Sequence, residues 1–368
     1  MDSDLLKTVL SPNGEDFRFW DFTMAGADGI FSDRGAIPVT AAGSAVFLAL
    51  DRHGQGSKSI SDIEAAFPEL YSPSNTILTQ DPGRTALIVG MAIDFNGQPT
   101  GSGVGADISF TSTPGQTYRV TYTRIGTVGC SAGNTQGGSN YGSSSVGAGS
   151  RGSFYFVAAS TQTWVHFTSN SPSAAAAQGI SIQQVPLGIA VQSSSSASKP
   201  AWQNPGIKFD GSDDYLVPDW KAKSGANCII FQADVPASMA APQLVSSVYG
   251  SNANFGIGFL ETGKLIGQVG TATGAAIFDG TGVDNRGKTV VGALVINGAT
   301  VKLYLNGSVV FSGAQNGNPS TTLNPYIGAS LGSGVAGSFF GGTIRRIAYG
   351  QVAPTADKIV AISNLWAT

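Results

Sequence analysis

Two stretches in the C-terminal half decide the fold: PGIKFDGSDDYLV, residues Pro205 to Val217, and KTVVGALVINGATVKLYLNGSVV, residues Lys288 to Val310. In the second stretch, Asn-Gly pairs at 297–298 and 306–307 separate short runs rich in valine, leucine and isoleucine. Asn-Gly favours two-residue hairpin turns because both turn residues must accept positive φ. The sequence therefore predicts an antiparallel meander, and GGTIRRIAYG at 341–350 predicts a further strand.

A helix is predicted at the C-terminal end of the chain, beginning after Pro354 and Thr355. Its apolar positions recur at helical spacing, at Ile359, Ile362, Leu365 and Trp366. A helix with one apolar stripe needs a partner surface, and we expect this one to pack across one edge of the sheet.

Several features of residues 202–368 together resemble the concanavalin A-like lectin/glucanase and laminin-G-like superfamily. They are the opening FDG and DYL, the YLNG hairpin, the YIGAS strand, the GTIRRIAYG strand and the terminal helix. The resemblance implies a lectin-type jelly roll, in a superfamily that holds both sugar binders and glycan hydrolases. One departure is Thr289-Val290-Val291, which stands where the family often has an aromatic-His pair before the central strand.

The acids of this region argue against catalysis. Glycoside hydrolysis needs two carboxyl groups roughly 5 to 10 Å apart. Glu261 is the only glutamate after position 200, and no acid lies two or four residues from it. We therefore expect a protein that is not an enzyme and has no catalytic residue.

An acidic turn is the remaining candidate for ion chemistry. Asp210, Asp213, Asp214 and Asp219 lie close together in a GSDD segment, and aspartates in turns usually accept hydrogen bonds from the backbone. We expect this structural role and no cofactor. Calcium held by Asp213 and Asp214 is the alternative, although calcium takes six to eight oxygen ligands and this segment supplies only part of such a shell.

Aromatic residues near the opening strand are candidates for a sugar platform. Trp202, Tyr215 and Trp220 flank that strand, and an aromatic ring offers a flat apolar face with, in tyrosine, a polar tip. Packing into the core is the more ordinary role of each residue. The sequence therefore favours core packing for each of the three and keeps glycan binding as the alternative role.

Residues 81–192 predict a second β-sandwich. Short strand-like runs follow one another with turn signals between them: ALIVGMAIDF, ADISFTS, QTYRVTYTRI, SRGSFYFVAA, TQTWVHFT and GISIQQV. Their rhythm resembles carbohydrate-binding-module jelly rolls. A Gly/Ser/Asn-rich loop at 127–150 carries Tyr141, a further candidate for glycan binding or a protein contact, against the plainer role of a spacer. Trp164 and His166 share one face of their strand, and the sequence does not decide which face is buried.

Residues 1–80 differ from both sandwiches. In WDFTMAGADGIFSDRGAIPVT, Phe31, Asp33, Gly35 and the Pro38-Val39-Thr40 run resemble a segment recurring in structural proteins of tailed phages. The following SISDIEAAFPELY predicts a short helix. A segment of this size buries little surface of its own. We therefore expect a small mixed region, 1–80, that attaches to other virion proteins.

Whole-chain composition fits an all-β protein of two or three domains. Of the 368 residues 12% are charged and 50 are glycine. The net charge of −3 gives no basic footprint for nucleic acid, and no apolar run is long enough for a membrane span. Cys130 and Cys228 lie in different predicted domains, so we expect no disulfide between them. A serine-rich linker at 193–201 separates the two sandwiches.

These observations lead to one functional hypothesis and one alternative. The hypothesis is a structural protein of a phage virion, of fibre or spike type, that is assembled in the bacterial cytoplasm and associates with itself as a trimer. Its lectin-like domain would adhere to glycan on the host surface. The alternative is a purely architectural head-decoration, head-fibre or tail protein whose sandwiches contact only other proteins.

Overall fold

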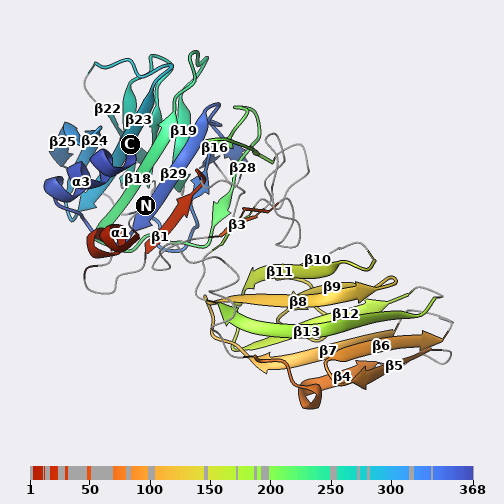
Figure 1. Ribbon diagram of the computed structural model, residues 1–368. Coiled ribbons are helices and arrows are strands. Elements are labelled where there is room, and N and C mark those ends of the chain that lie inside the picture. The colour runs from red at the N-terminus through yellow and green to blue at the C-terminus, as the bar shows by residue number, and fades with distance from the viewer. Residues whose placement is uncertain are drawn as a thin grey trace. The chain divides into compact units, whose positions relative to one another are not determined.

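The chain folds into two compact units built almost wholly from β-strands (Figure 1). The first unit contains described residues from Met1–Ile30, Val39–Lys58 and Ala190–Thr368, and the second from Phe31–Pro38 and Ser59–Ile189. The computed structural model describes residues 3–10, 12, 17–23, 30–31, 48–50, 69–79, 84–97, 104–144, 148–170, 173–185, 189–191, 199–248, 255–271, 274–279, 282–314, 319–332 and 335–367. The predicted all-β class with two sandwiches is confirmed.

A large antiparallel sheet is the centre of the first unit. Its strands, in spatial order, are β15 (Ala201–Gln203), β16 (Gly206–Lys208), β29 (Thr343–Gly350), β18 (Ala226–Asp234), β23 (Thr289–Asn297), β24 (Thr300–Leu305) and β25 (Ser308–Ala314). An eighth strand, β1 (Phe17–Asp21), pairs with β29 from Gly350 to Arg346, while β16 pairs with β29 at Ile344 and Thr343. The N-terminal strand therefore completes the edge of β29 that β16 leaves open.

The predicted meander of β23, β24 and β25 is present. Asn306 and Gly307 both have positive φ, 48° and 81°, and form the two-residue turn between Leu305 and Ser308, as the Asn-Gly signal predicted. In the first hairpin, Asn297 pairs with Thr300. Gly298 and the residue after it therefore make that turn, one position later than the Asn-Gly pair suggested.

A second sheet packs on the inner face of the large one. Its order is β22 (Gly274–Asp279), β21 (Leu265–Thr271), β20 (Phe255–Phe259), β19 (Gln243–Val248) and β26 (Tyr326–Ile327). The core between the sheets is rich in aromatic and branched side chains, including Trp20, Trp220, Phe231, Phe259 and Tyr349. Burial of this much apolar surface is the main stabilising term for the unit.

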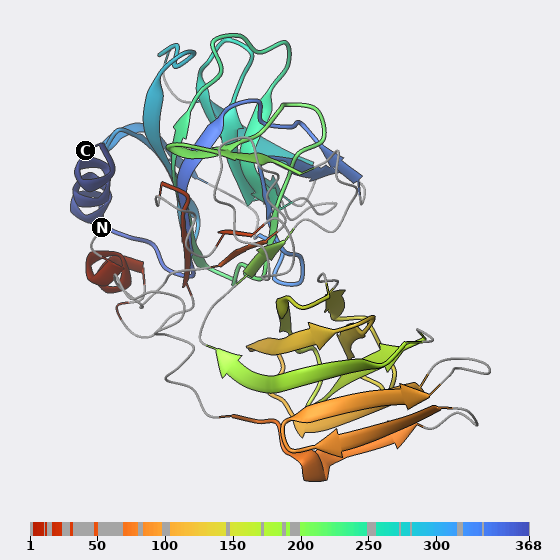
Figure 2. The same cartoon turned by 45° about the vertical axis from the view of Figure 1, so that its right-hand side comes forward.

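The outer face of the large sheet is buried as well. Helices α1 (Ser3–Leu10) and α3 (Ala356–Ala367) lie side by side over it, as Figures 1 and 2 both show. Ile359, Ile362 and Trp366 of α3 are fully buried against strand residues such as Ile230. The predicted terminal helix is confirmed, but it covers a face of the sheet rather than one edge.

The N-terminal part of the chain differs from the predicted separate region 1–80. Leu6 of α1 and Phe17 and Phe19 of β1 pack with α3 in the outer-face core, and Trp20 enters the core between the sheets. These side chains find their apolar partners in the C-terminal half of the chain, so the segment is an integral part of the first unit. The phage-like segment after Thr23 and the helix predicted at 59–67 lie mostly outside the described residues.

Two short sheets remain, and most of their residues belong to the first unit. One has the order β17 (Val217–Pro218), β14 (Ile189–Val191), β3 (Leu48–Leu50) and β2 (Ile30–Phe31), and the other pairs β27 (Ser330–Gly332) with β28 (Val335–Gly337). The serine-rich linker predicted at 193–201 lies mostly outside the described residues, and its last residue already belongs to β15.

The second unit is a sandwich of two five-stranded antiparallel sheets. One sheet has the order β10 (Gly142–Ser144), β9 (Gly129–Gly133), β12 (Gln162–Ser169), β7 (Val104–Thr111) and β4 (Thr76–Thr79). The other has β11 (Arg151–Val157), β8 (Thr117–Ile125), β13 (Ala175–Val185), β6 (Ala92–Gly97) and β5 (Arg84–Val89). Because β4 and the preceding 3-10 turn η1 (Pro73–Asn75) belong to this sandwich, it begins before the predicted boundary at residue 81.

The face that the sequence left undecided in β12 is settled by its packing. Val165 and Phe167 are fully buried in the core between the two sheets, whereas Trp164 and His166 lie half-buried on the outer face. Cys130 and Cys228 are both free and buried, one in each unit, in agreement with the expected absence of a disulfide between them. No helix among the described residues is long and apolar enough to cross a membrane.

Candidate functional site

The acidic turn between β16 and β17 is held by its own carboxylates. The Asp210 side chain accepts hydrogen bonds from the backbone N–H of Ser212 at 2.7 Å and of Asp213 at 3.3 Å. The Asp214 carboxylate accepts one from the N–H of Asp210 at 2.8 Å. Gly211, with φ of 81°, makes the sharp bend and lies close to Gly341. The structural role expected of this turn is therefore visible in its hydrogen bonds.

The three carboxyl groups of the turn are close enough to share a cation. One oxygen each from Asp210, Asp213 and Asp214 lies within 4.8 Å of the others. Burial raises the pKa of Asp214 to about 6, with the neighbouring charges of Asp210 and Asp213 adding to the shift. Calcium ligands must be ionised oxygens or carbonyls, six to eight in number. The turn offers three carboxylates, one of which resists ionisation, so calcium remains a prediction here.

An aromatic pair flanks the acidic turn. The ring of Tyr215 lies 5.1 Å from that of Tyr326, centroid to centroid, with 37° between the planes. Their chain neighbours Leu216 and Ile327 are fully buried in the core and pair backbone to backbone. Because successive strand residues point to opposite sides, the two tyrosines point away from the core, and each is half-buried. Burial, and then the neighbouring Tyr215, raise the pKa of Tyr326.

Sequence reasoning identified Tyr215 but missed its partner. The YIGAS run predicted a strand, and the alternation of Tyr326 with the apolar Ile327 was the available signal that the tyrosine faces outward. What the sequence lacked was the pairing of two segments that are more than a hundred residues apart. The pair and the acidic turn together define the candidate site of this unit: Asp210, Asp213, Asp214, Tyr215 and Tyr326.

The two tryptophan candidates lie in the core instead. Trp220 is fully buried, 5.1 Å from the ring of Tyr349, and Trp202 is 7% exposed. Neither indole presents a face to a ligand, which corrects the suggestion of a sugar platform at these two positions. The apolar area of an indole is sufficient reason for this placement.

Tyr141 also has a structural position. Its ring stacks on Phe156 at 5.7 Å with 13° between the planes, and its hydroxyl lies 2.8 Å from the Ser160 Oγ. The residue is half-buried against the core of the second unit. It therefore anchors the 127–150 loop, which corrects its candidacy as an exposed platform.

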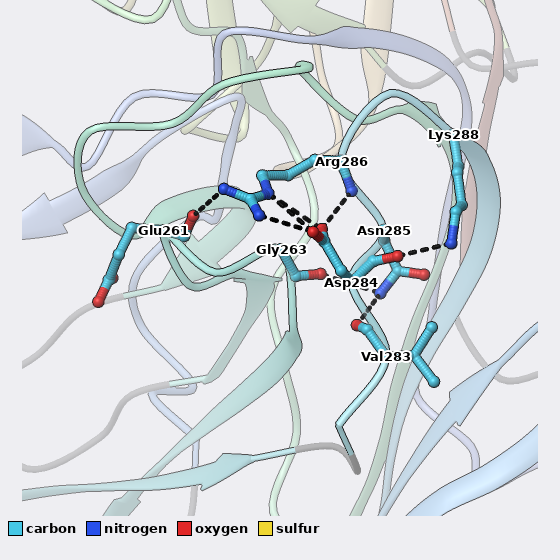
Figure 3. Close-up of polar contacts among 7 residues, drawn as sticks. All are labelled: Glu261, Gly263, Val283, Asp284, Asn285, Arg286 and Lys288. Carbon is cyan, nitrogen blue, oxygen red and sulfur yellow. Dashed lines mark hydrogen bonds and ion pairs between the residues drawn. The ribbon is translucent and has the colours of Figure 1, made fainter.

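A second polar cluster joins two loops at the rim of the first unit (Figure 3). Buried Asn285 donates hydrogen bonds from its side-chain nitrogen to the carbonyls of Gly263 at 2.9 Å and Val283 at 3.0 Å. Arg286 binds the exposed Asp284 with both its Nε and Nη2, which holds the pKa of that carboxyl at about 2. The Glu261 side chain points away from Arg286, which binds only its carbonyl (Figure 3). The cluster fixes the rim and assembles no pair of facing carboxyl groups.

A β-bulge aims two arginines at one cavity on the outer face of the large sheet. Opposite β18, Arg345 is an extra residue between Arg346 and Ile344, and a bulge turns consecutive side chains toward the same side. Both line a cavity of about 360 Å³. Arg345 pairs with Asp234 at 2.8 Å, while Arg346 donates to Gln232 and to the carbonyl of Trp366. Both charges are engaged inside the protein, and of the two arginines only Arg346 holds the end of α3, a contact that we call the arginine clamp.

Comparison with known proteins gives a family match over most of the larger sandwich. Residues 209–360 match the family model of the concanavalin A-like lectin/glucanases superfamily. This stretch is therefore similar to the concanavalin A-like lectin/glucanase domains that the family model describes. The match includes the acidic turn, both tyrosines of the pair and the meander, and we call the first unit the lectin-like sandwich. No curated protein matches the sequence.

Solved structures give distant matches. The sialidase carbohydrate-binding module CBM40 of Ruminococcus gnavus, bound to alpha2,3 sialyllactose, has 16% identity and a TM-score of 0.34 over 38% of this chain and 83% of its own. The binding domain of Paraclostridial Mosquitocidal Protein 1 has 13% identity and a TM-score of 0.35, over 44% of this chain and 43% of its own. The NanB sialidase of Streptococcus pneumoniae has 15% identity and a TM-score of 0.33, over 38% of this chain and 24% of its own. These similarities are too distant to bear on the ligand of this chain.

Proposed function

We propose that the lectin-like sandwich binds glycan through the Tyr215–Tyr326 pair, with the acidic turn beside it supplying hydrogen-bond acceptors. The observation that carries this proposal is two tyrosine rings 5.1 Å apart on the outer side of a lectin-like fold. Aromatic faces stack on the apolar face of a sugar ring, and the exposed Asp210 and half-buried Asp213 accept hydrogen bonds from hydroxyl groups. The proposed role is binding without turnover.

The biological setting is part of the same proposal. We place the protein in a tailed-phage virion, as a fibre- or spike-type structural protein that forms a trimer and meets host-surface glycan. This rests on the resemblance carried by residues 20–56 and on the lectin-like domain. A purely architectural role, in which both sandwiches contact only proteins, is the alternative that the experiment must separate from it.

A glycan array probed with the full chain tests the binding step. The probe set is bacterial capsule and lipopolysaccharide fragments, with calcium in one arm and a chelator in the other. Tyr326→Ala should weaken binding about tenfold, which corresponds to 1.4 kcal/mol. Val309→Ala changes an exposed side chain on β25 of the same unit and should leave binding unchanged. Binding that is equal in wild type and Tyr326→Ala would reject the tyrosine pair.

The calcium and enzyme arms are read from the same material. A metal at the acidic turn would be supported if wild-type binding is lost in chelator and returns when calcium is added, and if Asp213→Asn does not bind even with calcium. Release of free sugar from any probe would contradict the non-enzymatic role. A folded chain that binds no glycan under either condition would favour the architectural alternative.

A further inference from the structure

The outer face of the β9–β12–β7 sheet in the second unit carries an aspartate–histidine pair. The Nδ1 of His166 lies 2.6 Å from Oδ1 of Asp107, directly across the β12–β7 pairing. Asp107 is 2% exposed, yet it also accepts hydrogen bonds from the Gln136 side chain at 3.1 Å and the Gly137 N–H at 3.0 Å. A carboxylate so deep in a sheet needs these donors because burial penalises its charge.

The pair fixes the histidine ring. Burial opposes ionisation of Asp107, but the hydrogen bond and charge of His166, with the Gln136 and Gly137 donors, outweigh it and lower the pKa of the carboxyl. An ionised carboxylate only accepts, so Nδ1 donates its proton to Asp107 and the ring is held with Nε2 directed away from that carboxylate. Among the described residues no hydrogen bond reaches Nε2. Gly105 leaves the ring its place, since a Cβ there would lie 2.7 Å from the histidine Cε1.

An aromatic ring lies next to the histidine on the same face. Trp164 is two residues before His166 in β12 and is half-buried. Its cross-strand partners are the small residues Ser109 and Gly133. The loop after Gly133 folds back over that glycine, because a Cβ there would meet Asn140 and Gly138. Trp164 therefore has the small side chain of Ser109 on one side and the polar loop after Gly133 on the other.

A cavity adjoins this row. Thr168, two residues after His166 on the same face of β12, lines a space of about 460 Å³ with Gly129, Thr127, Ser144 and Asn170. Its volume falls within the range of small-ligand sites, roughly 300 to 1,000 Å³. The lining is uncharged apart from Arg124, whose Nε donates to the carbonyl of Gly126. Neither Trp164 nor His166 lines this space, which begins at Thr168, and its hydroxyl and amide groups suit a neutral, hydroxyl-rich ligand.

We infer that this outer face is a second carbohydrate-binding site, with Trp164 as the stacking platform and His166 Nε2 as a hydrogen-bond partner of an uncharged pyranose sugar. Asp107 is a positioning residue that holds the histidine and the loop. Loop anchoring alone does not account for the pair: Asp107 already holds the loop through Gln136 and Gly137, and among the described residues His166 makes no hydrogen bond to that loop. The site is separate from the tyrosine pair, so it stands or falls independently of the proposed function.

Binding of uncharged glycans by the full chain tests the inference. An array of neutral hexose and N-acetylhexosamine oligosaccharides is probed with wild type, Trp164→Ala, Trp164→Phe, His166→Ala and Gln178→Ala. Gln178 is an exposed polar residue on the other sheet of the same sandwich and serves as the control. We expect about a tenfold loss for Trp164→Ala and His166→Ala, near-normal binding for Trp164→Phe, and no change for Gln178→Ala. Circular dichroism shows whether each variant is folded.

Parallel measurements with Tyr326→Ala separate the two sites. Binding lost in Trp164→Ala and kept in Tyr326→Ala supports the second site whatever happens at the first. Neutral-glycan binding that Tyr326→Ala removes and Trp164→Ala leaves intact overturns it. Absence of binding to every neutral glycan at millimolar concentration, measured by saturation-transfer NMR on folded protein, overturns it as well.

Discussion

The central strands of the two sandwiches differ in how they are covered. In β18 of the lectin-like sandwich every residue from Asn227 to Ala233 is buried, whereas in β12 of the second unit Trp164, His166 and Thr168 are half-exposed between buried neighbours. One face of the large sheet packs against the second sheet, and the other face is covered by the helices α1 and α3. A sheet covered on both sides presents ligand groups at its turns and edges, and a sheet covered on one side presents them on its open face.

The largest expected effect comes from removing residues 1–23. Phe17, Phe19 and Trp20 are buried in the two cores of the lectin-like sandwich, and each should contribute about 1.5–3 kcal/mol. We expect the shortened chain to lose roughly 5 kcal/mol or more of unfolding free energy in that unit. Hydrogen exchange of β29 and α3 amides measures this, with β12 amides as the internal control. Unchanged protection of the β29 amides would instead support the predicted separate N-terminal attachment region.

Replacing a residue of α3 tests directly whether this helix buries the outer face of the large sheet. Trp366 is a fully buried residue of α3, and its ring stacks on that of Phe19 with 6.0 Å between the centroids. Trp366→Ala should lower the unfolding free energy by about 3–5 kcal/mol. Val360→Ala, at a position 40% exposed on the same helix, should stay within about 0.5 kcal/mol. Denaturant titration compares them, and equal effects of the two changes would contradict a buried outer face.

The contacts of Arg346 should contribute more to the unfolding free energy than the exposed ion pair between Arg286 and Asp284. Arg346 is 16% exposed and contacts Asp21, Gln232 and the end of α3. Arg346→Met should cost about 2–4 kcal/mol, because it leaves the buried Asp21 without its basic partner and with only the Thr23 donors. Arg286→Met breaks the exposed pair with Asp284 and should cost under about 1 kcal/mol. Thermal unfolding ranks the two, and the reverse order would reject the clamp.

Two buried aspartates should give the sandwiches opposite acid responses. The pKa of Asp107 lies below 3.8, so its contribution is present above that pH and is lost as the pH falls further. The pKa of Asp214 is raised to about 6, so stability of its unit falls as the pH rises from about 4 to 6. Asp214→Asn should flatten that fall, by roughly 1–3 kcal/mol. Unfolding measured from pH 3 to 7 checks both signs.

The sequence predicted the strands well because their signals are local. The alternation in TQTWVHFT, the Asn306-Gly307 turn and the apolar spacing of Ile359, Ile362 and Trp366 each lie within one element. The two coverings of the large sheet were not predictable in this way. They depend on contacts between distant segments, such as the pairing of β1 with β29 more than 300 residues later.

The candidate site was predicted only in part for the same reason. Tyr215 and the aspartates are neighbours in the chain and were found together, whereas Tyr326 joins them through pairing at long range. Trp202 and Trp220 were ambiguous because an indole near a turn suits either a core or a platform. Burial, which decides between these roles, depends on the second sheet and not on their own strand.

Hydrogen–deuterium exchange of the full chain, with and without its best array glycan, tests glycan binding at the tyrosine pair most directly. The account predicts slower exchange at residues 209–217 and 326–328 on binding, and no such change in Tyr326→Ala at the same glycan concentration. Glycan-dependent protection confined to other segments of the lectin-like sandwich, with these two segments unchanged, would contradict it.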